Sequence, residues 1–416
     1  MTLAVDAGRV LDDLQELAAA SGGEHAGATR LAWSPEWTAA RAWFLGKLDQ
    51  LGSVSVDRDE AGNIWAELPG DGSIDGFIII GSHLDAVPSG GWLDGALGVM
   101  AALEVLRTLA ATDAPPPVTV RVVDWADEEG ARFGRSLVGS SAVAGTLDPD
   151  DVRDLLDADG MTLQDAMASV GVDLYAASAA TARLQGARAY LELHIEQGPV
   201  LLDTGRLASA VSGTFGDERY LIHLTGQAAH AGSTPMHLRR DTLAAAATAA
   251  LEIREVGIRH GGVTTVGSIA SRPGVITAIA GESEMMLDLR HLDAGALASM
   301  LAECRVACER AAETFGCGVS FRRVFGATPT PFHPRLIEIA RAAVEAAGGG
   351  DGPPIPSGPL HDATEIGRRV PTVMIFAQSD PPVSHAEVED SPEPALRVAI
   401  DAFGRTVAGV LDHVAP

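Results

Sequence analysis

Residues 78–99, IIIGSHLDAVPSGGWLDGALGV, place a histidine and two aspartates directly after an apolar run. The run Ile78–Ile80 is typical of a buried strand, and His83, Asp85 and Asp94 follow it among Gly, Ser and Pro residues. Ionisable side chains are costly to bury unless they are paired or bind a metal. Because imidazole and carboxylate groups are ligands of divalent transition metals, this stretch indicates a metal site.

Three further segments follow the same pattern, a β-rich apolar run that ends in acidic residues or histidine. They supply Glu128 and Glu129, His194, and His385. Helical stretches separate most of these runs, so the chain predicts an α/β sheet, in which ligands bind beyond the carboxyl ends of the strands. We therefore expect the polar clusters to converge in space. The segments are VTVRVVDWADEEG (118–130), AYLELHIEQG (189–198) and VPTVMIFAQSDPPVSHAE (370–387).

The candidate metal ligands are three histidines and two acids. They are too many for one open catalytic zinc, but they suit two ions about 3.5–4 Å apart that share a carboxylate. Each residue alone is weak evidence, since a lone histidine is more often a surface or core residue and DEEG is more often a solvated turn. Their joint placement at strand ends favours the metal interpretation. The five ligands are His83, Asp94, Glu129, His194 and His385.

The remaining acids of these clusters suit other roles. Glu128 and Glu129 are neighbours on an irregular turn, so one can bind metal while the other faces a water molecule. A carboxylate in that position acts as general base and later as general acid. Asp85 is expected to accept the second ring N–H of His83, as metal-bound histidines usually require. Pro88–Gly91 is expected to form a turn that leads to Asp94.

The middle of the chain has a different pattern. Its order of strands and helices is β-α-β-β-α-β, which predicts an inserted ferredoxin-like α+β domain. We place its borders near residues 213 and 328. The outer segments, 1–212 and 329–416, are expected to form one catalytic α/β domain with a mixed sheet, and 146–188 a surface excursion of it.

Composition excludes several classes of function. The chain has 416 residues and a net charge of −26, which argues against nucleic acid and against an anionic membrane surface. It contains no apolar run of about 18 residues, and its first residues suit an amphipathic helix rather than a signal peptide. With only three cysteines, a cytoplasmic location is expected. Cys304 and Cys308 could touch a metal, but buried free thiols are the favoured interpretation.

The ordered motifs resemble one known family. GSHLDAVPSGGWLDGALGV, DEEGARFGRSLVGSSAVAG, LELHIEQGPVL, GQAAHAGSTPMHLRRD, LDLR, SGPLHDA and SHAE are similar to motifs of the M20 metallopeptidase superfamily. HIEQGP and EEGARFGRSLVGS resemble its carbamoylase/allantoate amidohydrolase branch. The resemblance extends from about residue 30 to 410.

This resemblance implies a binuclear hydrolase. His83, Asp94 and His194 would hold one ion and share Asp94 with a second, which Glu129 and His385 would complete. The ions would be Zn, Mn, Co or Ni, and Glu128 would be the general base. The resemblance also implies a homodimer built through the inserted lid domain.

The same resemblance assigns substrate residues. His230 matches a lid histidine that stabilises the oxyanion, and Arg290 an arginine that pairs with a substrate carboxylate; Gln197 and His361 match substrate-side positions. For Arg290 a solvated strand face is the alternative, because it alternates with Leu287 and Leu289.

Two positions depart from the family pattern. Thr277 stands where an asparagine is usual, with Ala280 in place of a proline, and Thr364 follows HDA where glutamine is common. These departures concern the grip on the substrate rather than the metal chemistry.

The predicted function is hydrolysis of a linear amide or ureido C–N bond, foremost in an N-carbamoyl-L-amino acid. Another N-acyl amino acid, a dipeptide or a specialised catabolic amide is the alternative within enzymes. A metal-free binding protein is the alternative from another class, and it would lack at least one ligand or the base. All of these residues are present.

Overall fold

The computed structural model describes residues 3–20, 28–112 and 114–414. The chain forms two compact units, which are described separately. The larger unit comprises Met1–Gly213 and Phe332–Pro416, and the smaller one comprises Thr214–Pro331. The sequence had placed these borders near 213 and 328.

The larger unit is built on a mixed sheet in the order β8-β17-β7-β4-β6-β3-β2, with β16 beside β8. The four central strands, β17, β7, β4 and β6, run parallel. Strand β8 pairs antiparallel with β17, β3 with β6, and β2 with β3. The predicted α/β class with a mixed sheet is confirmed. The strands are β2 (Ser55–Arg58), β3 (Ile64–Leu68), β4 (Phe77–His83), β6 (Thr119–Trp125), β7 (Ala187–Ile195), β8 (Ala208–Thr214), β16 (Ile355–Ser357) and β17 (Thr372–Ala377).

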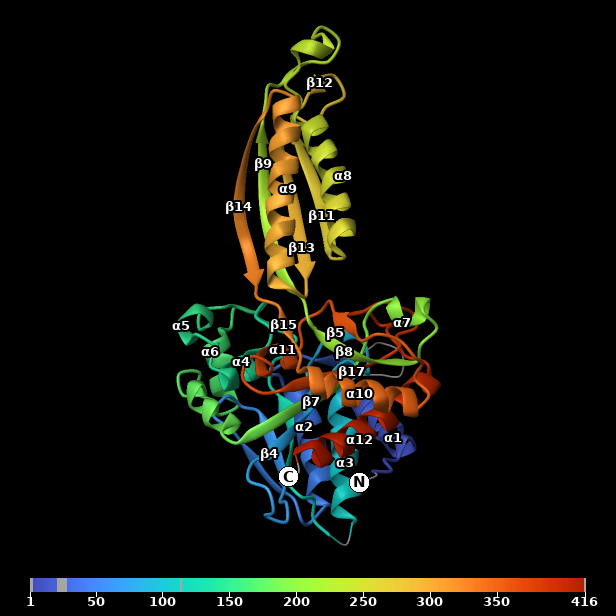
Figure 1. The fold of residues 1–416 in the computed structure, drawn as a ribbon. Helices are drawn as coiled ribbons and strands as arrows, with labels where there is room; N and C mark the ends of the chain where they lie inside the picture. The colour runs from blue at the N-terminus through green and yellow to red at the C-terminus, as the bar shows by residue number, and fades with distance from the viewer. Residues whose placement is uncertain (1–2, 21–27, 113, 415–416) are drawn as a thin grey trace. The chain divides into compact units, whose positions relative to one another are not determined.

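The central strands form because their residues are apolar on both faces. Every residue of β4 is buried, as expected for a parallel strand covered by helices on both sides. Helices supply the two covering layers (Figure 1). One layer contains α1 (Ala7–Ala20), α2 (Pro35–Asp49), α3 (Ala96–Ala110), α10 (Pro334–Ala346) and α12 (Glu393–Val414); the other contains α4 (Val138–Ala144), η1 (Ala177–Leu184) and α11 (Asp362–Ile366).

One local prediction was wrong. Pro88–Gly91 was expected to be a turn, but β5 (Ala86–Gly90) pairs antiparallel with β1 (Ala28–Arg30) in a separate two-stranded sheet. The backbone pairing continues across Pro88 because proline is tolerated in an edge strand. Residues 146–188 carry two short helices as well as η1, and several of their side chains are buried. The remaining short helices of this unit are α5 (Pro149–Val152), α6 (Leu163–Ser169) and α7 (Val200–Asp203).

The smaller unit contains the β-α-β-β-α-β order that the sequence predicted. Its four-stranded antiparallel sheet has the order β11-β13-β9-β14, and α8 and α9 pack on it over a core that includes Cys304 and Cys308. Helix α8 begins at Thr242, where Asp241 caps it by accepting from the N–H groups of Leu243 and Ala244. The elements are β9 (Gly216–Thr225), β10 (Ala229–His230), η2 (Met236–Leu238), α8 (Thr242–His260), β11 (Val263–Arg272), β12 (Ala278–Ile279), β13 (Glu282–His291), α9 (Ala294–Thr314), β14 (Gly318–Ala327) and β15 (Thr330–Pro331).

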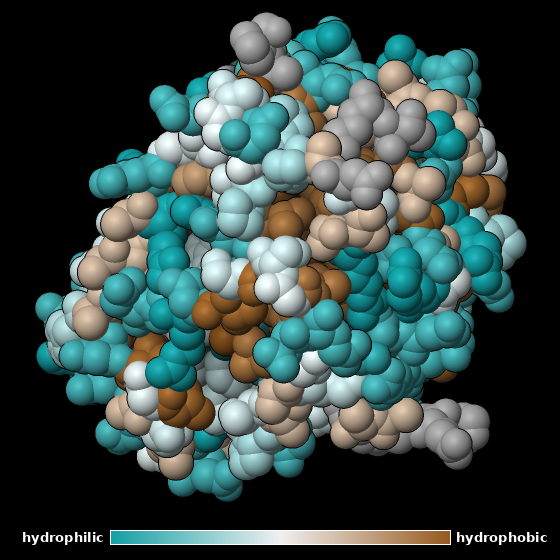
Figure 2. Space-filling model, turned by 90° about the horizontal axis from the view of Figure 1, so that it is seen from below, coloured by the Kyte–Doolittle hydropathy of each residue, from teal (hydrophilic) through white to brown (hydrophobic). Residues whose placement is uncertain are grey.

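Within the described residues, no helix is long and apolar enough to cross a membrane. Figure 2 shows one face of the molecule, on which hydrophilic side chains surround smaller hydrophobic patches.

Candidate metal centre

The parallel strands bring the predicted ligands to one edge of the sheet. His83 is the last residue of β4 and lies opposite Trp125, the last residue of β6, so the turn that carries Glu128 and Glu129 begins beside it. His194 lies near the end of β7, opposite Phe376 of β17. The expectation that the clusters converge is therefore met by the register of the strands.

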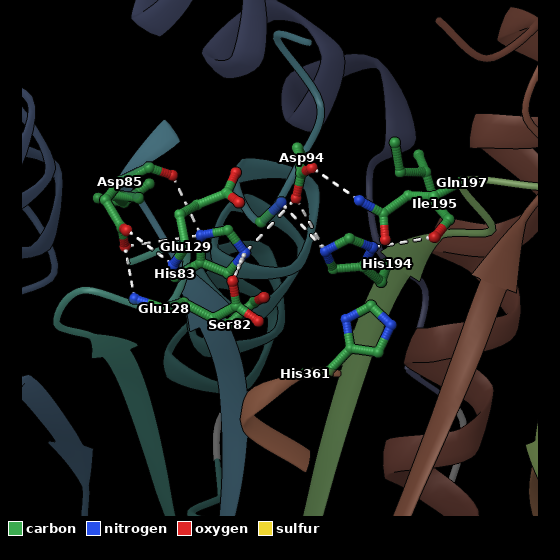
Figure 3. A network of polar contacts seen from close by, with 12 residues as sticks. Ser82, His83, Asp85, Asp94, Glu128, Glu129, His194, Ile195, Gln197 and His361 are labelled. Atoms are coloured by element: carbon green, nitrogen blue, oxygen red, sulfur yellow. Dashed lines mark hydrogen bonds and ion pairs between the residues drawn. The ribbon is translucent and has the colours of Figure 1, made fainter. Parts of the chain in front are cut away.

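Asp94 lies at the middle of the cluster (Figure 3). Its Oδ1 is 3.5 Å from His83 Nε2 and 3.1 Å from His194 Nε2. On the other side, His385 Nε2 lies 3.8 Å from Asp94 Oδ2 and 3.3 Å from Glu129 Oε2. The ligand atoms thus fall into two groups that share one carboxylate: His83, Asp94 and His194, and Asp94, Glu129 and His385.

Main-chain carbonyl groups fix the ring orientation of two histidines. His83 Nδ1 lies 3.1 Å from the carbonyl oxygen of Asp85, and His194 Nδ1 lies 2.9 Å from that of Ile195. A carbonyl oxygen only accepts, so each Nδ1 carries the proton and donates it. In the neutral ring the lone pair then belongs to Nε2, which faces Asp94 in both cases. This is the tautomer that a metal ligand needs.

The electrostatics fit a pair of cations. Burial opposes protonation of His83, yet the carboxylates of Glu128, Asp94 and Asp85 raise its pKa well above the usual value. Glu129 raises the pKa of His385 to about 9. Among the described residues, His83 Nε2 and Glu129 Oε1 are buried without a hydrogen-bond partner. Excess negative charge around unpaired ligand atoms is what two divalent ions would neutralise.

Glu128 points its carboxylate at the same centre. Its Oε2 lies 3.6 Å from His83 Nε2, and burial raises the pKa of Glu128 well above the usual value for a glutamate. A carboxyl group with a raised pKa is suited to take up a proton and hold it. The geometry therefore allows the general-base role predicted from the sequence.

Asp85 acts differently from the prediction. Its carbonyl oxygen, not its carboxylate, accepts from His83; the carboxylate Oδ1 is 3.7 Å away. The two carboxylate oxygens instead accept from the main-chain N–H groups of Glu128 and Glu129, at 3.2 and 3.1 Å. Asp85 thus holds both glutamates in place from a position that is 1% exposed. Sequence spacing could not show this, because the partners lie in the turn after β6, more than 40 residues along the chain.

Strained backbone is concentrated around the site. Asp127, Gln197 and His385 are non-glycine residues with φ of 58°, 57° and 55°. Gly95, which follows Asp94, has φ of 64°, and a Cβ there would lie 2.4 Å from the ring of His83. Such conformations persist only where the surroundings hold them, and they often mark functional sites.

Two of the predicted substrate residues lie beside the cluster. The Gln197 amide nitrogen donates to Asp94 Oδ2 at 2.8 Å and to Ser384 Oγ at 2.9 Å. Its Oε1 is buried without a partner within the described part of the chain, so it remains an acceptor. The ring of His361 lies 4.5 Å from that of His194, and burial lowers the pKa of His361 well below the usual value, which keeps it neutral.

His230 and Thr277 lie together in the smaller unit. His230 pairs with Ala278 between β10 and β12, and the N–H of Ala231 donates to the carbonyl of Thr277. His230 Nδ1 accepts from the main-chain N–H groups of Gly232 and Ser233, at 3.1 and 3.2 Å. In the neutral ring the proton is therefore on Nε2, so the exposed His230 can donate it to an oxyanion.

Arg290 lies on the outward face of β13, as alternation with the buried Leu287 and Leu289 predicted. It is half-buried rather than fully solvated. Its Nε donates to Asp288 Oδ1 at 2.8 Å and its Nη2 to Asp288 Oδ2 at 3.3 Å. Arg219 binds the same carboxylate at 2.9 Å. Asp288 thereby holds the guanidinium group that was predicted to receive a substrate carboxylate.

Thr364 has a local structural task. Its hydroxyl accepts from the main-chain N–H of His361, which forms part of a capping box at the start of α11. The side chain is buried and its hydroxyl group is engaged there. The effect of Thr364 on the grip on the substrate stays a prediction. Thr277 is exposed beside His230.

Comparison with known proteins gives the same family as the motifs. A profile of peptidase family M20/M25/M40 matches residues 79–409. The chain belongs to this family. An N-carbamoyl-L-amino acid amidohydrolase of Geobacillus stearothermophilus is 34% identical over 403 residues, covering 96% of this chain and 97% of that protein. An allantoate amidohydrolase of Escherichia coli (strain K12) is 34% identical over 365 residues, covering 87% and 88%.

A solved structure agrees with these relatives. The amidase of the hydantoinase/carbamoylase family from Burkholderia multivorans superposes with a TM-score of 0.88 at 30% identity, covering 99% of this chain and 98% of that one. The resemblance to the M20 superfamily that the motifs carried is confirmed. M20 amidohydrolases are metal-dependent, and the two groups of candidate metal ligands in this chain agree with that property of the family.

Sequence reasoning missed several residues that support the M20 site. Trp33 Nε1 donates to Asp127 Oδ2 at 2.8 Å, next to Glu128, and the buried Arg30 donates from Nε to the carbonyl of Leu84 at 2.6 Å. Glu389 is also buried beside His385. The motif SHAEVED contains a possible signal for Glu389, because this acidic residue lies four positions after His385. Trp33 and Arg30 gave none, because their partners lie far away in the sequence.

Proposed function

We propose that this protein is a two-metal amidohydrolase that cleaves the ureido C–N bond of an N-carbamoyl-L-amino acid or a related ureido acid. The observation that carries the proposal is the pair of ligand groups sharing Asp94, with Glu128 directed at the same point. The names of the relatives favour a ureido substrate over other amides. The reaction converts the ureido acid and one water into the amino acid, carbon dioxide and ammonia.

Two divalent ions, when bound, would polarise the carbonyl group and lower the pKa of a water molecule. His83, Asp94 and His194 would hold one, and Asp94, Glu129 and His385 the other. Glu128 takes the proton from the attacking water and returns it to the departing nitrogen. The Asp85 carboxylate accepts from the main-chain N–H of Glu128 and thereby keeps Glu128 in position.

The predicted substrate residues carry groups that suit a ureido acid. Gln197 Oε1, which is unpaired among the described residues, suits an N–H of the ureido group. Arg290 suits a carboxylate and His230 the developing oxyanion, as the donors described above allow. Thr277, in place of the usual asparagine, would contribute a hydroxyl group near His230. His361 is a further substrate-side residue in this proposal.

A substrate panel tests the proposal. The purified protein is loaded with Zn, Mn, Co or Ni and given N-carbamoyl-L-amino acids, allantoate, N-acetyl amino acids and dipeptides. Release of ammonia together with the amino acid supports ureido hydrolysis. Release of acetate or of two amino acids without ammonia favours the alternative, an N-acyl amino acid or dipeptide hydrolase, which Thr277 keeps open. No turnover of any substrate with two ions bound would refute both.

Further properties belong to the same proposal. The ions are taken to be Zn, Mn, Co or Ni, since mixed histidine and carboxylate shells accept all of these. The protein is proposed to be a cytoplasmic homodimer that acts on small molecules and binds neither nucleic acid nor membranes. Light scattering on the eluted protein tests the dimer, and metal analysis of protein purified without chelator tests the ions.

A further inference from the structure

Glu389 is buried beside the second group of ligands, although nothing above gives it a role in the reaction. It is 1% exposed, and its Oε2 accepts from the main-chain N–H of His385 at 2.9 Å. His385 has φ of 55°, a conformation that a histidine adopts at some energetic cost. A carboxylate that accepts the N–H of this very residue stabilises the conformation in which the ring reaches Glu129.

A second path leads from Glu389 to the shared carboxylate. Ser384 interacts with the Glu389 carboxylate through its hydroxyl group. The same hydroxyl oxygen accepts from Gln197 Nε2 at 2.9 Å, and Gln197 Nε2 also donates to Asp94 Oδ2 at 2.8 Å. Asp94 Oδ2 is the oxygen that faces His385. Glu389 is thus linked to His385, which belongs to the second group alone, and to the oxygen of the shared Asp94 that faces His385 rather than His83 and His194.

The surrounding chain is shaped around this carboxylate. A Cβ on Gly91 would lie 1.8 Å from Glu389 Oε1, so only glycine fits there. Next to it, Trp92 Nε1 donates to Asp390 Oδ1 at 3.2 Å. The loop that precedes Asp94 is therefore packed against the loop that carries His385. Both loops contribute to the same ligand group, and Glu389 lies where they meet.

The first ligand group is held in a different way. His83 and His194 are fixed by the carbonyl groups of Asp85 and Ile195, on strands of the central sheet or directly after them. Neither contact involves Glu389. Removing Glu389 should therefore affect the two groups unequally.

We propose that Glu389 is a positioning residue for the second ion, the one that Asp94, Glu129 and His385 would hold. This inference rests on the proposed two-metal function. Without the Glu389 carboxylate, the main-chain N–H of His385 loses its acceptor. The Ser384 hydroxyl, which binds Gln197 and through it Asp94, loses its contact with Glu389. Removal of such an outer-shell partner typically weakens metal binding about 10- to 100-fold. If Glu389 only anchored a loop, its loss would lower the stability of the protein without weakening the binding of one ion more than the other.

Metal titration of the chelator-treated protein tests this. Isothermal titration calorimetry with Mn²⁺ should show two binding events per chain for the unaltered protein. In Glu389→Ala one event should weaken by about 10- to 100-fold while the other stays within roughly threefold. His385→Ala should remove that same event, and the double variant should lose no more than His385→Ala alone. Glu387→Gln is the matched control, because Glu387 is exposed two residues away and should bind both ions normally.

Ser384→Ala provides a second test if Glu389→Ala does not fold. It removes the hydroxyl that joins Glu389 to Gln197, keeps the contact of Glu389 with the His385 N–H, and should weaken the same event by roughly 2- to 10-fold. Equal weakening of both events, or unchanged binding in folded Glu389→Ala, would overturn the inference. These outcomes are separate from failure of the proposed function, which would show as fewer than two ions or no hydrolysis in the unaltered protein.

Discussion

Asp85→Asn is the substitution for which the structure gives the clearest expectation. The two carboxylate oxygens of Asp85 accept from the N–H groups of Glu128 and Glu129, and the residue is buried. Hydrogen bonds to a charged group contribute about 1.5–3 kcal/mol each. Asparagine keeps one acceptor, but its NH₂ group then faces the other N–H, so one bond is lost and two donors oppose each other. We expect a cost of about 3 kcal/mol.

Two measurements check this expectation. A cost of this size lowers Tm by roughly 6 °C in a unit of this size. Turnover should fall about 10- to 100-fold, because the base and a metal ligand are both displaced. Asp12→Asn, on the exposed side of α1, is the matched control and should change neither quantity. The reasoning is refuted if Asp85→Asn keeps both the Tm and the kcat/KM of the unaltered protein.

Four further outcomes are expected. Glu128→Gln should lower kcat by about 10²- to 10⁴-fold while both ions stay bound, and near-full turnover would contradict its role as base. Asp288→Asn should raise KM for a carboxylate-bearing substrate by about tenfold with kcat little changed, because Arg290 loses its support; an equal loss in kcat would argue against this. Chelation should abolish turnover and lower Tm, since an ion at 100 times its Kd contributes about 2.7 kcal/mol; a metal-free active enzyme would disprove the metal assignment. Thr364→Val should cost about 1 kcal/mol of stability through the lost helix cap beside His361 and leave substrate preference unchanged, which a substrate panel on the variant checks.

Much of the architecture could be read from periodicity. The apolar runs that end at His83, His194 and the DEEG turn are strands because they are buried on both faces, and parallel strands place their carboxyl ends together. The β-α-β-β-α-β insertion was equally visible. The turn expected at Pro88–Gly91 failed because its partner, β1, lies far earlier in the chain. Long-range pairing of a short edge strand leaves no local signal.

The ligand types were predictable, whereas the contacts that hold them were not. Residue types reveal which side chains can bind a metal, but much of this site is fixed by main-chain atoms. The carbonyl of Asp85 orients His83, its carboxylate holds the N–H groups of Glu128 and Glu129, and Glu389 holds the N–H of His385. Any residue supplies an N–H or a carbonyl, so these partners have no signature in the sequence.

The two ions are expected to respond differently to substitutions, because the backbone of their ligands is held in different ways. The ligands of the first group come from β4, from β7 and from Asp94, which directly precedes the N-cap residue of α3, so the sheet and its covering helix fix the backbone. His385 instead lies in a loop beyond β17, in a strained conformation that depends on one buried carboxylate. Strain that is held by a single contact is released when that contact is lost, whereas a sheet redistributes the loss over many hydrogen bonds. The second ion is therefore the one whose occupancy should follow substitutions in the loops around Gly91 and Glu389.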